Sequence, residues 1–342
     1  MYIGIREFKC FEFEVSDLTP ERREIIQDIK NILLRAGYRV TVNTDLRPSC
    51  FDIVARRGES LLLLKVHENI DAFKEDAGRE LKILSKMLSA SPIIIGERTR
   101  KEPVQDWFLY ERHGLPAINT ESFERFIEKN VFPIVFAKRG GLYVKIDGES
   151  LKRAREKKEM SFGELANSIR VSRRTIYEYE RGGMDSTLET AMRLEEVLNV
   201  PLAVPFNIVS WLTEEEEIPE QEAEDELEEE VRQTLRELGL KVVFARKAPF
   251  DALTADQKDQ KKVVITGLGY AQEKRIEQRI ISIEKVSQVA QKYAMFVLDD
   301  NKIKNISTEI PVIPKEELQA IEEPEALFRL IYERQGLKTI KN

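Results

Sequence analysis

The 342-residue sequence contains few of the residues that build metal centres and disulfide frameworks. Its only cysteines are Cys10 and Cys50, and its only histidines are His67 and His113. A structural zinc site needs clustered ligands such as CxxC, and these four residues are widely separated. We therefore expect no metal and no cofactor, and two unpaired thiols in a reducing compartment.

The sequence also lacks a long hydrophobic run and a recognisable targeting segment. Apolar runs such as those at 61–64 and 92–95 are the length of strands, whereas a membrane span needs about 20 apolar residues. Residues 1–15 contain neither a basic region followed by an apolar stretch nor a small-residue cleavage site. We expect a cytoplasmic protein without a membrane span, and the length suggests two or three domains.

The charge of the chain is unevenly distributed. The formal net charge is −7, but residues 214–230 hold twelve acids and no base, so the rest of the chain carries +5. Within 151–182, nine Lys or Arg residues stand against five Glu residues. Because DNA affinity depends on local neutralisation of phosphates, the acidic total does not exclude a DNA-binding protein.

Two parts of the sequence repeat the same succession of elements. Each begins with a helix end, a Gly and an alternating strand, at 33–42 and 234–244. Both parts then continue, from 51 and from 250, with a strand that begins Phe-Asp, an apolar strand, a helix, a further strand and a final strand with its helix. The order α-β-β-β-α-β-β-α in each part predicts two related α/β units, each a sandwich around a mixed sheet.

The repeat divides the chain into domains. The fold class we predict is α/β plus all-α: two related α/β units flank a domain of four to five helices. The predicted segments are a first α/β copy at 1–130, a β-hairpin connector at 131–148, a helical domain at 149–210, an acidic linker at 211–230 and a second, degenerate α/β copy at 231–342. The hairpin is indicated by two alternating strands about Gly140-Gly141.

Capping residues divide the helical segment into short helices with tight turns. The first helix is expected to start after Ser150, and Ser161 with Glu164 and Ser186 with Glu189 have the spacing of capping boxes. Ser172 caps a helix at 172–181, which Gly182-Gly183 ends. The apolar residues that recur at helical spacing predict a shared core of Leu165, Ala166, Ile169, Val171, Ile176, Tyr179, Leu188, Ala191, Leu194 and Leu198.

This segment resembles the Cro/repressor (XRE-type) helix-turn-helix family. SFGELA, VSRRTIYEYERG and TLETAMRLEEVL stand where the motifs of that family stand. The resemblance implies that helix 172–181 is the recognition helix and that Arg155 and Glu180 form a shielded ion pair. Arg170 departs from the family, which usually has Gly in the turn. A left-handed Arg there costs on the order of 1 kcal/mol of stability.

The resemblance also indicates which residues contact double-stranded DNA. The amino-terminal residues of a recognition helix face base edges in the major groove, and here they are Arg173 and Arg174, followed by Tyr177 and Glu178. Arginine reads guanine and glutamate accepts from cytosine N4. The residues expected at phosphates or the DNA backbone are Ser161, Phe162, Ser172, Thr175 and Arg181. The alternative interpretation is that the charged side chains only solvate an exposed helix.

The first α/β copy resembles the PD-(D/E)xK nuclease fold. Asp52 heads one strand and Lys65 lies in the next, as that family requires, but Leu63 stands where the second metal-binding carboxylate belongs. The second copy keeps Asp251. It offers Val264 or Ile265 at the acid position and Thr266 or Gly267 in place of the lysine. We therefore interpret Asp52 and Lys65 as a vestigial site, unless Glu24, Glu59 or Glu68 migrates into it, and expect no enzyme activity.

The acidic stretch allows two interpretations. Its composition is typical of a solvated linker. Alternatively, residues 214–226 compete with phosphate for the basic helix-turn-helix surface and so inhibit DNA binding.

The whole chain resembles an archaeal group of phage-repressor-type regulators that combine a helix-turn-helix with a nuclease-like region. The resemblance implies a sequence-specific transcriptional regulator that binds a palindromic operator as a homodimer. The alternatives are a nuclease targeted by its helix-turn-helix and an antitoxin-like protein that regulates only itself. The sequence identifies neither an operator nor a small-molecule effector.

Overall fold

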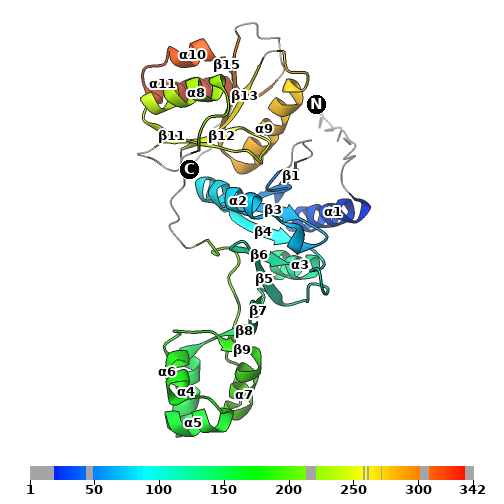
Figure 1. Ribbon diagram of the computed structural model, residues 1–342, viewed down its shortest axis with the longest axis vertical. Helices are drawn as coiled ribbons and strands as arrows, with labels where there is room; N and C mark the ends of the chain where they lie inside the picture. The colour runs from blue at the N-terminus through cyan, green and yellow to red at the C-terminus, as the bar shows by residue number, and fades with distance from the viewer. Residues whose placement is uncertain are drawn as a thin grey trace, which may run out of the picture.

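The computed structural model describes residues 19–43, 49–212, 221–256, 259, 262–270, 272–300 and 308–335. An N-terminal α/β unit occupies the middle of the molecule, with a helical domain at one end and a second α/β unit at the other (Figure 1). The prediction of two mixed sheets with a helical region between them in sequence is confirmed. Within the described ranges, no helix is long and apolar enough to cross a membrane.

The N-terminal unit packs helices on both faces of a mixed sheet. Its elements are α1 (Pro20–Arg35), β1 (Arg39–Val42), β2 (Ile53–Arg57), β3 (Ser60–Val66), the 3₁₀ turn η1 (Ile70–Ala72), α2 (Glu75–Leu88), β4 (Ser91–Ile95), β5 (Phe108–Arg112), β6 (Leu115–Ile118) and α3 (Thr120–Lys129). Strand β3 lies at the centre because its LLLLKV run is buried on both faces. One face of the sheet packs on α1 and α3, and the other face contributes to a core beneath α2.

The sheet of this unit continues into the helical domain. Its order is β1-β2-β3-β4-β6-β5-β7-β8-β10, and the short β9 also pairs with β8. Strand β5, which the predicted repeat pattern omitted, pairs with β6 and then with β7 (Val135–Lys138). The hairpin of β7 and β8 (Gly141–Ile146) therefore belongs to a continuous sheet and is more than a connector.

The helical domain consists of α4 (Gly148–Lys157), α5 (Phe162–Ile169), α6 (Arg173–Glu180), β9 (Ser186–Thr187), α7 (Leu188–Leu198) and β10 (Ala203–Val204). Two predicted helix starts were wrong. Helix α4 begins at Gly148 because Asp147 caps it and accepts a hydrogen bond from the Ser150 amide. Helix α7 is capped by Thr187, since Ser186 is buried in β9.

The C-terminal unit contains a five-stranded sheet in the order β11-β12-β13-β14-β15. Its elements are α8 (Glu226–Glu237), β11 (Leu240–Phe244), β12 (Ala252–Asp256), β13 (Val263–Gly269), α9 (Ile276–Ala290), β14 (Tyr293–Leu298), β15 (Val312–Pro314), α10 (Lys315–Gln319) and α11 (Pro324–Gln335). Two antiparallel pairings followed by two parallel ones give it the strand order and directions of β1-β2-β3-β4-β6.

The predicted linker 211–230 ends earlier than expected. Helix α8 begins at Glu226, because Asp225 caps it and Leu227 and Val231 enter the core of the second unit. The acids of its first turn lie where the helix dipole favours negative charge. Residues 213–220, which include most of the segment considered for autoinhibition, lie outside the described residues.

The two α/β units share one hydrophobic core. Helix α9 packs against β1 and β2, and α2 packs against β12, so each unit covers a sheet of the other. The equivalent residues Phe51 and Phe250 meet with ring centroids 6.4 Å apart. The Cys50 amide donates to the Lys247 carbonyl at 2.7 Å, and burial raises the pKa of the Cys50 thiol well above its usual range.

Candidate nucleic-acid interface

Helices α5 and α6 form a helix-turn-helix whose ends are fixed by side-chain caps. The Ser161 hydroxyl accepts from the Glu164 amide, and the Glu164 carboxylate accepts from the Ser161 amide at 2.8 Å. These bonds also hold the pKa of Glu164 below its usual range. At α6 the Ser172 hydroxyl accepts from the Thr175 amide at 3.0 Å. Both caps satisfy amides that a helix cannot satisfy itself, which allows helices of eight residues.

The turn between α5 and α6 runs through a left-handed residue. Arg170 ends α5 with φ +60°, a conformation that glycine adopts without steric cost. The Arg170 amide donates to the Asn167 carbonyl and the Val171 amide to the Ala166 carbonyl. Ile176 and Ala166 are both buried in the core of the domain. The turn therefore sets the angle between α5 and α6 at a cost in backbone strain.

The amino-terminal end of α6 presents two arginines to solvent. Arg173 and Arg174 are exposed, whereas Ile176 and Tyr179 on the opposite side of the helix are buried. The Arg173 guanidinium lies over Gly163, where a Cβ atom would come within 2.7 Å of its Nε. Gly163 thus allows Arg173 to lie across the start of α5.

An aromatic contact joins α5 and α6 beside these arginines. The rings of Phe162 and Tyr177 meet edge to face at 6.3 Å between centroids. The Arg155 guanidinium lies 4.3 Å from the Phe162 centroid, and Arg181 lies 5.4 Å from that of Tyr177. Tyr177 remains 47% exposed, so its ring is available to a partner. The Glu178 carboxylate lies against Gly183 in the turn that follows α6.

An ion pair ties α4 to the carboxyl end of α6. Arg155 Nε donates to Glu180 Oε1 at 2.6 Å and Nη2 donates to Oε2 at 3.1 Å. The side chains are only 9% and 6% exposed. Arg155 Nη1 also donates to the Met160 carbonyl, and the contact with Glu180 raises the pKa of Arg155 above its usual range. The pair fixes α6 against α4, because a bidentate contact restrains orientation as well as distance.

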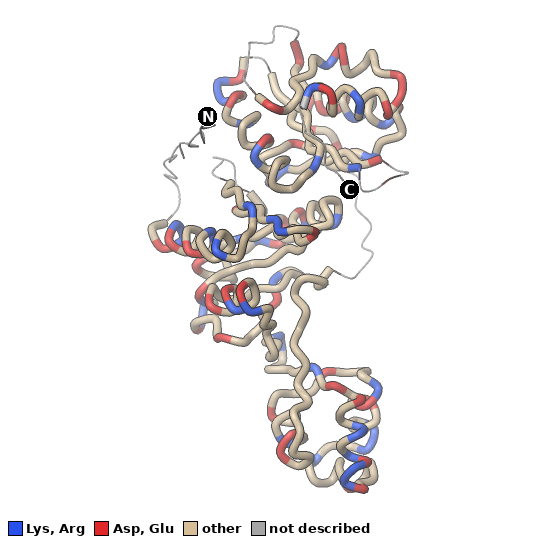
Figure 2. The backbone as a smooth tube through the Cα atoms, turned by 180° about the vertical axis from the view of Figure 1, so that it is seen from behind, with Lys and Arg blue, Asp and Glu red and all other residues tan. Residues whose placement is uncertain are grey.

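The described acidic residues of 221–230 and the basic helix-turn-helix lie in different parts of the molecule (Figure 2). The helix-turn-helix carries Lys and Arg residues at the end of the molecule remote from the C-terminal sheet (Figure 2). Several described acids of 221–230 pair with bases of their own unit, since Glu224 and Glu228 contact Arg246 and Glu229 contacts Arg232. This part of the acidic stretch is therefore engaged within the C-terminal unit.

In the N-terminal unit, Asp52, which stands where the nuclease fold has a metal-binding aspartate, is surrounded by the side chains of Arg22 and Lys65. Asp52 Oδ1 accepts from Arg22 at 2.8 Å and from Lys65 at 3.1 Å, and Oδ2 accepts from the Val66 amide. Lys65 Nζ also donates to the Ser49 carbonyl, and Arg22 Nε donates to the Val66 carbonyl. Both oxygens of Asp52 are thus already bonded.

These residues do not fit the Mg²⁺ ion that the nuclease fold implies. Magnesium needs converging oxygen ligands, but Leu63 is fully buried in apolar surroundings. Of the glutamates considered for migration, Glu24 and Glu59 are exposed and Glu68 contacts Thr19 and Arg98. Among the described residues, no group of three His, Cys, Asp or Glu side chains is arranged to hold a metal.

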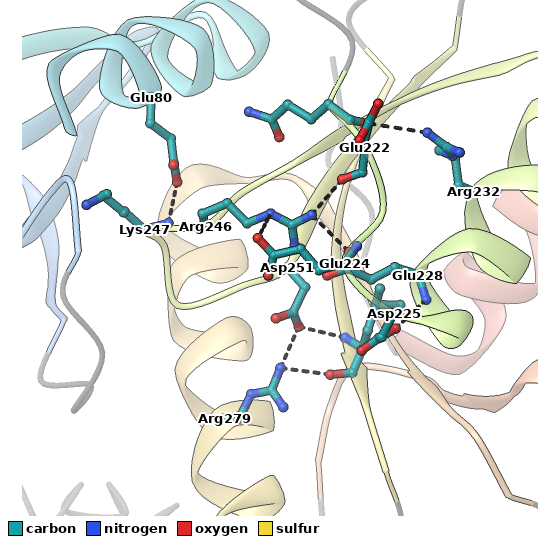
Figure 3. Close-up of polar contacts among 12 residues, drawn as sticks. Glu80, Glu222, Glu224, Asp225, Glu228, Arg232, Arg246, Lys247, Asp251 and Arg279 are labelled. Carbon is teal, nitrogen blue, oxygen red and sulfur yellow. Dashed lines mark hydrogen bonds and ion pairs between the residues drawn. The ribbon is translucent and has the colours of Figure 1, made fainter. Parts of the chain in front are cut away.

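The second unit repeats the arrangement with a different arginine. Asp251 Oδ2 accepts from the Leu268 amide at 2.7 Å and from Arg279 at 2.6 Å, and Arg279 also donates to the Leu268 carbonyl (Figure 3). Asp251 thus corresponds to Asp52 and Leu268 to Val66. Arg279 projects from α9, whereas Arg22 projects from α1. In both units a guanidinium neutralises the aspartate.

This equivalence fixes the register that the sequence left open. Since Leu268 corresponds to Val66, Ile265 stands at the acid position and Gly267 at the lysine position. A Cβ atom on Gly267 would lie 2.4 Å from the Phe296 ring and 2.5 Å from Ile283, so no side chain fits there. Sequence reasoning missed Arg22 and Arg279, because neither lies in a motif and each reaches its aspartate only through tertiary packing.

Contacts between the units lie next to this second site. Glu80 on α2 accepts from the Lys247 amide, and Lys247 Nζ pairs with Asp76 at 2.7 Å. Arg246, the preceding residue, pairs with Glu228 (Figure 3). Burial raises the pKa of Glu80 above its usual range. The loop between β11 and β12 is thereby clamped to the first unit.

Two regions of the chain match known protein families. A PD-(D/E)XK superfamily domain matches residues 22–133, and a helix-turn-helix domain matches residues 151–204. Proteins named "Putative HTH-type transcriptional regulatory protein" are similar over nearly the whole chain. Those of Thermococcus gammatolerans, Pyrococcus abyssi and Archaeoglobus fulgidus are 37%, 36% and 36% identical, over 93%, 93% and 91% of this chain and 98%, 100% and 97% of their own lengths. No solved structure matches the chain significantly.

Proposed function

The chain belongs to the archaeal family of helix-turn-helix-type transcriptional regulatory proteins, and on that premise we propose that it is a sequence-specific DNA-binding regulator. The observation that carries this proposal is the end of α6, where Arg173 and Arg174 are exposed while the opposite face of the helix is locked into the core. Such a helix places its first residues at base edges in the major groove.

The proposed contacts divide into base readout and backbone positioning. Arg173 and Arg174 read guanine through bidentate hydrogen bonds, and each lost pair costs about 1 to 3 kcal/mol. Glu178 and Tyr177 extend the readout by one turn. The remaining contacts, which go to phosphates and sugars, are proposed for Ser161, Phe162, Ser172, Thr175 and Arg181.

Selection of duplexes from a randomised library tests the proposal. The wild-type chain is expected to enrich one motif, and the Arg173→Ala/Arg174→Ala variant is expected to lose discrimination between that motif and scrambled DNA. The matched control is Arg98→Ala/Arg100→Ala, which removes two exposed arginines from the N-terminal unit. If the double α6 variant discriminates as the control does, the recognition-helix assignment is wrong.

We propose further that the two α/β units are inert copies of one ancestral unit. In each unit an arginine is paired with the aspartate, Asp52 or Asp251, whose carboxylate metal chemistry would need free. The copies cover each other like the subunits of a symmetric dimer, with Phe51 against Phe250. Incubation of supercoiled plasmid with Mg²⁺ or Mn²⁺ is expected to give no nicking. Nicking that disappears on Lys65→Ala would overturn this proposal.

One chain carries a single recognition helix, so binding to a palindrome requires two chains. We propose a homodimer that spans half-sites about 34 Å apart, one turn of DNA. Light scattering of the complex with the selected duplex is expected to give two chains per duplex. A single chain per duplex would exclude the dimer without affecting the recognition helix.

A further inference from the structure

The β7–β8 hairpin is the most basic short segment beside the helix-turn-helix. Residues 135–146 include Lys138, Arg139 and Lys145 and no acid. All three are exposed. Among the described residues, the side chains of Arg139 and Lys145 make no hydrogen bond or ion pair, whereas Lys138 pairs with Asp185 at 3.3 Å. The hairpin therefore presents positive charge that the protein does not itself neutralise.

The structure joins this hairpin to the recognition helix. Strand β8 pairs with β9, which lies between α6 and α7, through Tyr143 opposite Thr187. The Lys138–Asp185 pair holds the tip against the turn that follows α6. Lys138 Nζ also lies 4.5 Å from the centroid of the Tyr143 ring. Any DNA that receives α6 therefore lies close to the tip of the hairpin.

The backbone of the tip is compact and open to a partner. Lys138 pairs with Gly141, so the turn consists of Arg139 and Gly140, and Gly140 has φ +103°. This positive φ favours glycine. Gly140 and Gly141 leave the turn after Arg139 without side chains of their own, and the Tyr143 hydroxyl lies beside Gly140. The Arg139 guanidinium can thus approach a surface closely.

The length of α6 indicates which part of the DNA the tip would meet. A helix of eight residues is about 12 Å long, similar to the width of the major groove. With its first residues at base edges, its final turn and residues 181–185 reach the edge of the groove, where the phosphates lie. The hairpin tip is held against that turn.

We propose that the tip of the β7–β8 hairpin, with Arg139 as its principal residue, is a second DNA contact that binds backbone phosphates beside the α6 site. This inference rests on the proposed function and adds to it a contact outside the helix-turn-helix. The contact raises affinity for any duplex and carries no base preference, because a phosphate looks the same at every base pair.

The dependence of binding on salt tests the inference. Full-length protein is titrated against a fluorescein-labelled 40-base-pair duplex of random sequence and against the selected motif, from 50 to 200 mM NaCl. Loss of one phosphate contact lowers the slope of log Kobs against log salt by about 0.9. For Arg139→Ala, the ratio of Kd at 200 mM to Kd at 50 mM is therefore expected to fall by about 3.5-fold for each bound chain that loses the contact, or by about 12-fold when two chains occupy one duplex. Arg139→Lys keeps the charge and is expected to keep the slope.

The matched control is Arg329→Ala, which removes an exposed arginine from α11 in the C-terminal unit. It is expected to leave the slope unchanged. The inference is overturned if Arg139→Ala has the wild-type slope while Arg173→Ala/Arg174→Ala loses discrimination, and the proposed function then stands.

Two other outcomes also overturn the inference. If Arg139→Ala changes the oligomeric state in light scattering and leaves the slope unchanged, the hairpin is a surface for self-association. If the wild-type chain binds neither duplex, the proposed function fails together with the inference.

Discussion

Removing the charge of Glu180 is expected to loosen the recognition helix more than removing the whole Arg155–Glu180 pair. Both side chains are less than a tenth exposed, so Glu180→Gln leaves the buried Arg155 guanidinium with only the half-exposed Glu156 carboxylate, 3.7 Å from Nη2, as a counter-charge. Breaking a buried ion pair from one side typically costs about 3 to 5 kcal/mol. The Met160 carbonyl still accepts from Arg155, so the lower end of that range is expected.

The double variant Arg155→Met/Glu180→Leu is the informative comparison. It replaces the pair by apolar side chains of similar volume in surroundings that include the Phe162 ring, and such replacements are often neutral or stabilising. The double variant should therefore be more stable than Glu180→Gln. The effects on stability of neutralising Glu180 and of replacing Arg155 are then not additive.

Native-state hydrogen exchange of peptides covering 162–180 measures this local stability in the full chain. Protection in α6 is expected to fall strongly in Glu180→Gln and to recover in the double variant. Peptides from β14 serve as the internal control, since they lie in the C-terminal unit. If the double variant lost at least as much protection as Glu180→Gln, the reasoning about a stranded charge would be refuted.

Three further predictions concern stability. Burial, with the Lys65 and Arg22 cations, lowers the pKa of His67 to about 4. Between pH 4 and 6.5 the unfolded chain therefore binds more protons than the folded one, so the free energy of unfolding falls as the pH drops, by about 2 kcal/mol from pH 7 to 5. His67→Gln should remove this pH dependence from the stability measured by urea denaturation. Arg170→Gly is expected to stabilise the helical domain by about 1 kcal/mol, seen as slower exchange in α5. Gly267→Ala is expected to destabilise the C-terminal unit by about 1 to 3 kcal/mol, measured by urea denaturation, because its Cβ meets Phe296. Unchanged profiles in these variants would contradict the cited environments.

Local signals allowed much of the helix-turn-helix to be predicted. Ser161 and Ser172 are caps because their hydroxyls reach amides three residues away, and such contacts depend on sequence spacing alone. The choice between Ser186 and Thr187 could not be made in this way, because both have a suitable residue three positions later. Pairing of β9 with β8 decides it by burying Ser186.

The order of elements in the two α/β units and the positions of Asp52, Lys65 and Asp251 were also readable, but the arginines bonded to the aspartates were not. Phe51 and Phe250 mark equivalent strands through a shared Phe-Asp pair. The arginines that neutralise Asp52 and Asp251 come from different helices, so the repeat itself conceals their common role. Long-range pairing of β5 with β7 likewise carries no local signal. These features depend on tertiary packing, which sequence spacing does not encode.

Dimethyl sulfate protection of the selected duplex tests the central claim most directly, because the reagent methylates guanine N7, the atom that a bidentate arginine covers. The account predicts that wild-type protein protects guanines in each half-site, and that Arg174→Ala or Arg173→Ala exposes one of them while the rest of the footprint persists. Guanines that stay reactive under a fully bound wild-type chain would contradict the assignment of α6 as the helix that reads DNA.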